Sequence, residues 1–225
     1  MTLELEALLT SARAPAMAMT VASIATVVAI GDPRHPRLRQ WRWLWLFLVL
    51  NAVFNSRSFL PQEWAAPFGR ITTSVGRLLY MPPLLLGLAS IIAHGGYRRY
   101  ARIGAFVLAM QLVAALFVGG ILPTGVPILR TVISTVIILA VAAPAVIARL
   151  PRVRGSILQD PPMMAAIAAL LAYGSPLLFS PAAAGRGTAT PEYITLLWLR
   201  NLSWILAYAI WWYAFLKARR EERPA

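Results

Sequence analysis

Residues 70–94 read RITTSVGRLLYMPPLLLGLASIIAH, and this stretch decides the fold. It is apolar over a length that can cross a lipid bilayer, which takes roughly 20 residues. Arg77 lies inside it, and an ionisable residue within a membrane span is costly and marks a candidate functional site. Pro82 and Pro83 lie at its centre and release two backbone carbonyls from helical hydrogen bonding. The stretch therefore predicts a membrane helix with a distorted middle and a buried charge.

The composition of the whole chain is that of an integral membrane protein. Of its 225 residues, 59% are hydrophobic and 13% are charged, whereas soluble domains average about 45–50% and about 25%. The chain contains no cysteine, which excludes disulfides and thiolate metal sites. The net charge of +13 fits the basic loops that orient membrane proteins, so it does not predict a nucleic-acid partner.

Seven segments are long and apolar enough, or nearly so, to span a membrane. We therefore predict an all-α fold, a single seven-transmembrane-helix bundle over residues 1–225. The predicted spans cover residues 10–31, 41–60, 72–94, 101–122, 127–149, 161–181 and 192–216.

The basic residues gather in alternate loops, which predicts the orientation of the bundle. Positively charged loops stay in the cytoplasm, so the N-terminus is expected outside and the C-terminus in the cytoplasm of a multi-pass protein of the inner membrane. An odd number of spans requires the same arrangement. The clusters are Arg34, Arg37, Arg39 and Arg42; Arg98, Arg99 and Arg102; Arg149, Arg152 and Arg154; and Lys217, Arg219, Arg220 and Arg223.

Three arginines lie inside spans that run from the outside to the cytoplasm. Arg77, Arg130 and Arg200 each follow their outer boundary by a few residues, so all three are expected in the outer half of the membrane, with Asn201 beside them. Guanidinium groups suit carboxylates and phosphates, and the group predicts an outward-facing cavity for an anionic ligand. The alternative is that these side chains reach the outer headgroups or pair with nearby carboxylates.

Aromatic residues fall at helical spacing along the seventh span. Trp204 and Tyr208, followed by Trp211 and Phe215, are expected on one face. Such a face packs the bundle or anchors it at the interface, or it binds a flat polyene or isoprenoid-like ligand. We count Trp204 and Tyr208 among the candidate ligand-binding residues.

Prolines mark the predicted helix breaks. Pro82 and Pro83 in the third span, Pro144 in the fifth and Pro176 in the sixth lie within apolar segments. In transporters, such breaks lie beside binding sites and hinges, whereas the alternative is a static kink satisfied by neighbouring helices.

The residues needed for catalysis or metal binding are scarce inside the spans. His35 and His94 lie in or beside loops, and carboxylates are essentially missing from the span interiors. This pattern argues against a buried metal site, a carboxylate proton relay and an activated serine. We expect no enzyme, no catalytic residue and no metal site, and the sequence identifies no cofactor.

Two segments give the chain a resemblance to the microbial rhodopsin family. YMPPLLLGLASII in the third span resembles that family's third helix, and AYGSPLLF in the sixth is similar to its retinal-pocket segment. The resemblance implies seven spans with the N-terminus outside. That family attaches retinal to a lysine in its seventh helix, whereas the lysine of this chain is Lys217, at the cytoplasmic end. Alignment on Pro83 places Arg77 at the counter-ion position, so the resemblance implies an opsin relative without covalent retinal.

These observations predict a membrane protein that binds a small anionic or amphipathic ligand, as a transporter or a sensor-like receptor. The alternatives are a non-catalytic subunit that binds pigment, quinone or lipid within a larger membrane complex, and the lysine-less opsin relative. The expected partners are the lipid bilayer, an anionic or isoprenoid-like ligand and partner membrane subunits.

Overall fold

The computed structural model describes residues 13–31, 36–61, 63–64, 77–92, 95–118, 126–152, 156–183 and 190–221. Within these ranges the chain is all-helical, with seven α-helices and no strand. The helices are α2 (Ala14–Ile30), α3 (Arg42–Asn55), α5 (Arg77–Ile91), α6 (Gly95–Val118), α7 (Val126–Arg149), α8 (Pro161–Ala183) and α9 (Pro191–Glu221). Short 3₁₀ turns are η1 (Pro36–Trp41), η2 (Ser56–Phe59), η4 (Leu150–Arg152) and η5 (Ile157–Gln159).

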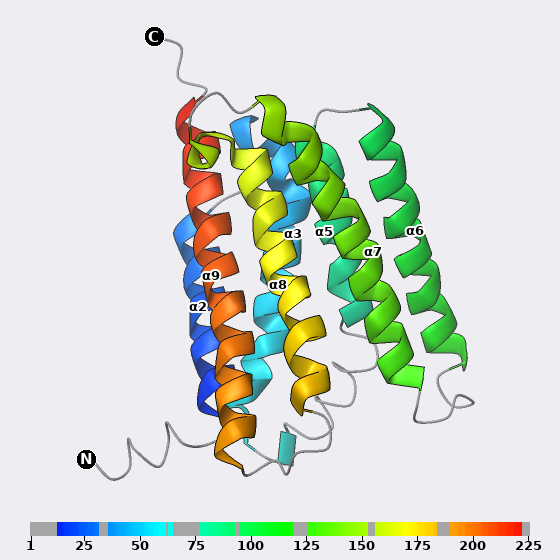
Figure 1. Ribbon diagram of the computed structural model, residues 1–225, viewed down its shortest axis with the longest axis vertical. Coiled ribbons are helices and arrows are strands. Elements are labelled where there is room, and N and C mark those ends of the chain that lie inside the picture. Colours follow the sequence, from blue (N-terminus) through cyan, green and yellow to red (C-terminus); the bar gives the residue numbers. More distant parts are fainter. Residues whose placement is uncertain are drawn as a thin grey trace.

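The seven helices form a closed ring. Each helix packs against the next one along the chain, and α9 returns to pack against α2. Figure 1 shows the bundle with α2 and α9 at one edge and α6 at the opposite edge. We call the end at which α2, α5, α7 and α9 finish the basic end, because the described arginines of the basic clusters lie there.

The helices lie on the seven predicted segments, although the ends of α3, α6 and α9 differ from the predicted bounds by several residues. The fourth helix, α6, begins at Gly95 rather than at residue 101. Arg98, Arg99 and Arg102 therefore lie on its first turns and not in a loop. Side chains satisfy backbone donors at two helix starts: Asp160 Oδ1 accepts from Met163 N at 3.0 Å, and Thr190 Oγ1 accepts from Tyr193 N at 3.3 Å. These are N-caps of α8 and α9.

The core consists of aromatic and small side chains. Trp211 is fully buried on α9 and meets Phe47 of α3 with ring centroids 5.2 Å apart. Its Nε1 donates to the carbonyl of Ala165 on α8 at 3.2 Å. Most residues of α8 from Pro161 to Tyr173 are buried, and many of the buried ones are alanines. Small side chains let neighbouring helices approach closely.

Two helices are long and apolar enough to cross a membrane by length and composition. They are 132–149 in α7 and 191–220 in α9, and only 33% and 22% of their apolar windows are buried inside the bundle. Three further apolar helices are shorter, at Ala14–Ile30, Leu79–Ile91 and Pro161–Ser175. The apolar character of these helices is therefore directed outward as well as into the core.

Candidate functional site: a basic pocket at one end of the bundle

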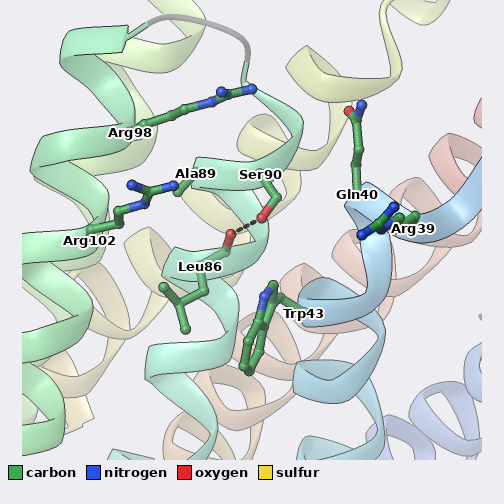
Figure 2. A pocket seen from close by; sticks show the side chains of 8 residues that line it. All are labelled: Arg39, Gln40, Trp43, Leu86, Ala89, Ser90, Arg98 and Arg102. Carbon is green, nitrogen blue, oxygen red and sulfur yellow. Dashed lines mark hydrogen bonds between the residues drawn. The ribbon is translucent and has the colours of Figure 1, made fainter.

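A pocket of about 640 Å³ opens at the basic end, where η1, α3, α5 and α6 meet. Two arginines of α6, Arg98 and Arg102, lie on one side of it, and the junction of η1 and α3 lies on the other. The last turns of α5 form its floor. Figure 2 shows the eight lining residues: Arg39, Gln40, Trp43, Leu86, Ala89, Ser90, Arg98 and Arg102.

Local sequence features place these side chains. Arg98 and Arg102 are four residues apart, so they share one face of α6. Gly87 lets α3 and α5 approach, because a Cβ atom at this position would lie 2.8 Å from the backbone nitrogen of Leu44. Ser90 Oγ donates to the carbonyl of Leu86 within α5, at 2.7 Å. The close contact between α3 and α5 at Gly87 therefore places the floor of the pocket, formed by α5, directly beside the wall formed by η1 and α3.

The charges in the pocket are all positive. Among the described residues, its lining holds three guanidinium groups and no carboxylate. Within the described part of the chain, Arg39, Arg98 and Arg102 make no salt bridge and no hydrogen bond. Like charges in one concavity concentrate a positive potential, and guanidinium forks fit carboxylates and phosphates. The pocket is therefore suited to an anion.

Other basic side chains at this end are engaged in the structure itself. Arg149 Nε lies 2.9 and 3.1 Å from the two carboxylate oxygens of Asp160. Lys217 Nζ donates to the carbonyl of Leu158 at 3.0 Å and so holds the α7–α8 connection against α9. Arg149 and Lys217 therefore stabilise the connection between α7 and α8. The pocket arginines, in contrast, are exposed.

The polarity of the pocket changes along the bundle axis. Figure 2 shows Arg98, Arg39 and Gln40 toward the end of the bundle, with Leu86 and Trp43 deeper along it. Trp43 is 44% exposed, so its ring is open to a ligand or to lipid. The pocket is therefore charged at its mouth and apolar at its inner end.

The predicted arginine layer at the opposite end is described in part. The side chains of Arg77 and Arg130 lie outside the described residues. Arg200 is half-buried on α9 and has an interaction partner. Asn201 is 2% exposed, and its Oδ1 has no hydrogen-bond partner among the described residues. Whether the three arginines line one cavity stays a prediction.

The aromatic residues predicted to share one face of α9 face the interior of the bundle, where they contact side chains of other helices. Tyr208 and Trp211 are buried, and Trp204 meets Tyr173 of α8 with ring centroids 5.2 Å apart. Trp204 and Tyr208 rings are 5.9 Å apart. These distances are those of packed aromatic pairs, so the described contacts of this face agree with the packing alternative.

Tyr208 also belongs to a buried polar network that joins three helices. Its hydroxyl donates to Asn51 Oδ1 at 2.7 Å and accepts from Asn55 Nδ2 at 3.1 Å. Thr20 Oγ1 of α2 lies 2.8 Å from the carbonyl of Asn55 and 2.9 Å from Ser58 Oγ. The network explains why two asparagines lie within an apolar helix: they bind α9 to α3.

The predicted helix breaks do not end their helices. The helix α5 runs through Pro82 and Pro83, α7 runs through Pro144, and α8 runs through the position of Pro176. Membrane helices tolerate proline where neighbouring helices and local adjustments can satisfy the carbonyls that it releases. Whether these prolines act as hinges or as static kinks stays a prediction.

Sequence reasoning missed the basic pocket. In the sequence, Arg39, Arg98 and Arg102 fit the pattern of orientation signals, and the four-residue spacing of Arg98 and Arg102 is the one local indication of a shared face. The described residues hold no group of three or more histidine, cysteine, aspartate or glutamate side chains that could bind a metal ion.

No family model, no curated protein and no solved structure matches this chain. The resemblance of two spans to microbial rhodopsins accordingly stays a prediction.

Proposed function

We propose that the chain is a multi-pass protein of the inner membrane with seven spans, its N-terminus outside and its basic end in the cytoplasm. The distribution of side chains supports this. Large apolar residues are strongly exposed on the outer faces of the ring, among them Val28 on α2, Phe106 on α6, Ile147 on α7 and Leu206 on α9. Extensive exposed apolar surface marks contact with a membrane or a partner.

The side chains buried inside the bundle also support a location in the membrane. Uncharged polar side chains are buried between the helices, where they form hydrogen bonds that hold membrane helices together. They are Thr20, Ser23, Thr26, Asn51, Ser134, Thr135, Ser175 and Asn201. A surface more apolar than parts of the interior is the arrangement that a lipid solvent favours.

Within this membrane protein, the basic pocket binds a small anionic or amphipathic ligand from the cytoplasmic side. One observation carries the proposal: three arginines without partners in the described structure surround a pocket of about 640 Å³. That volume lies within the range of small-molecule sites, roughly 300–1,000 Å³. Binding of this kind serves a receptor or a transporter.

Calorimetric titration of the purified protein with pyrophosphate tests this function. We expect binding that weakens as salt rises, because the contacts are charged and exposed. The double variant R98Q/R102Q should lose about tenfold or more in affinity, since each charged hydrogen bond contributes about 1.5–3 kcal/mol. Arg99→Gln is the matched control, because Arg99 is exposed on the same turns of α6 and does not line the pocket. Equal losses in both variants contradict the proposed site.

A transporter also needs an opening at the other end, and one observation favours it. Ser175 Oγ and Asn201 Oδ1 are buried without hydrogen-bond partners in the described part of the chain. Tyr173 and Trp204 pair across α8 and α9, so the antiparallel packing places Ser175 and Asn201 at one level. A buried group left unsatisfied costs about 1–3 kcal/mol, a cost that a polar substrate would offset.

The variant Asn201→Leu tests this second opening. It removes the unsatisfied amide, so we expect the melting temperature of the protein without ligand to rise. A lower melting temperature would show that the amide already contributes to stability, and the argument for an opening beside Asn201 would fail.

A further inference from the structure

The polarity gradient of the basic pocket identifies the class of its ligand. We propose that the pocket binds a phospholipid whose headgroup carries net negative charge and no ammonium group, drawn from the leaflet at the basic end. This inference rests on the proposed function, because it needs both the membrane and the anion site. To the proposed function, it adds the class of the bound molecule and the orientation of that molecule in the pocket.

The charged mouth selects the headgroup. Arg39 and Arg98 come from elements on opposite sides of the pocket, with Arg102 one turn further along α6. A phosphate placed among them can accept hydrogen bonds from several guanidinium groups at once. None of the eight lining side chains is a carboxylate. The ammonium of a choline or ethanolamine headgroup would therefore meet three positive charges and no negative one.

The inner end of the pocket suits the remainder of a lipid. Leu86 of α5 and the exposed ring of Trp43 on α3 lie on the membrane side of the arginines. Tryptophan rings are typical of the level where headgroups meet acyl chains. A lipid in its ordinary leaflet orientation would place its phosphate at the arginines and its first methylenes against these two side chains.

The gradient also argues against a small free anion as the natural occupant. Inorganic phosphate would use the mouth and leave the apolar inner end of a pocket of about 640 Å³ empty. Basic pockets between helices on the cytoplasmic side are a known means of binding anionic headgroups. Three observations carry the inference. They are the volume of the pocket, the three arginines that have no partner in the described structure, and the order of polar and apolar side chains along the bundle axis.

The test compares three probes on the full chain in neutral detergent: short-chain phosphatidate, phosphatidylcholine with the same acyl chains, and pyrophosphate. Affinity is measured by the rise in melting temperature with probe concentration. We expect phosphatidate to bind about tenfold or more tightly than phosphatidylcholine, a difference of about 1.4 kcal/mol. It should also bind more tightly than pyrophosphate, because only the lipid fills the inner end.

Matched variants show which residues produce the preference for phosphatidate. Arg98→Gln with Arg102→Gln should abolish the preference for phosphatidate over phosphatidylcholine, and Arg39→Gln, on a different element, should reduce it. Arg99→Gln should leave the preference unchanged. Trp43→Ala should weaken phosphatidate but not pyrophosphate, which distinguishes a lipid from a free anion.

The outcomes separate the two proposals. If pyrophosphate binds through Arg98 and Arg102 and phosphatidate binds no better, the anion site stands and the lipid inference fails. If neither probe depends on these arginines, both proposals fail. Equal binding of phosphatidate and phosphatidylcholine also overturns the inference, because it would show that acyl chains alone provide the affinity.

Discussion

Gly87 marks the closest approach of α3 and α5. A Cβ atom there would lie 2.8 Å from the backbone nitrogen and 3.0 Å from the Cα of Leu44, which cannot move without moving α3. We expect Gly87→Ala to lower the free energy of unfolding by about 1–3 kcal/mol, as overpacking of a core does. Gly174→Ala is the control, because nothing lies within 4 Å of its Cβ position on α8. Thermal unfolding of both variants in detergent measures the difference, and equal effects would contradict a close approach at Gly87.

Tyr208 is the second residue whose contribution can be isolated. Its hydroxyl both donates to Asn51 and accepts from Asn55 in a buried environment. Tyr208→Phe leaves those amides incompletely bonded, at a cost of about 1–3 kcal/mol. Tyr213→Phe on the same helix should be close to neutral, because Tyr213 is 42% exposed. If the two variants unfold at the same temperature, the network does not stabilise the bundle.

At the level of single elements, Tyr97 links α6 to α7 near the basic end. Its hydroxyl donates to the carbonyl of Val141 at 2.8 Å, and burial raises the pKa of Tyr97 to about 12 from the ordinary value of 10.0. The unfolded chain therefore loses this proton first as the pH rises. The stabilisation is fully present below pH 10 and is lost as the pH rises from there through about 12.

We therefore expect Tyr97→Phe to be less stable than the unsubstituted protein at neutral pH, and the difference to shrink above pH 10. Comparing the two proteins at each pH cancels the titration of the other groups. A difference that stays constant into alkaline solution would show that the hydroxyl of Tyr97 is not held in its protonated form.

Much of the helical organisation could be predicted, because the information is local. The lengths of the apolar segments predict seven helices, and the structure contains seven α-helices in its described residues. The pocket could not be predicted, because it depends on which helices become neighbours. Arg39 and Arg98 are far apart in the sequence, and only the packing of α3 and α6 against α5 brings them to one site.

The proposed orientation of the whole molecule in the membrane can be tested by labelling. The chain has no cysteine, so a single introduced cysteine reports one position without background. Ser156, between η4 and η5, is expected in the cytoplasm, and Arg186, in the predicted loop after the sixth span, outside. A membrane-impermeant maleimide added to intact spheroplasts should label Arg186→Cys and not Ser156→Cys. Labelling in the reverse pattern would invert the proposed orientation.

The closed ring also has a consequence for biosynthesis. Because helices adjacent in the sequence are adjacent in the ring, each can meet its predecessor soon after it is made. The contact between α2 and α9 is different, since an early helix must wait for the last. A chain that terminates before Pro191 lacks Tyr208, so the amides of Asn51 and Asn55 lose their partner on α9. We expect cells to degrade such truncated chains faster than the complete protein.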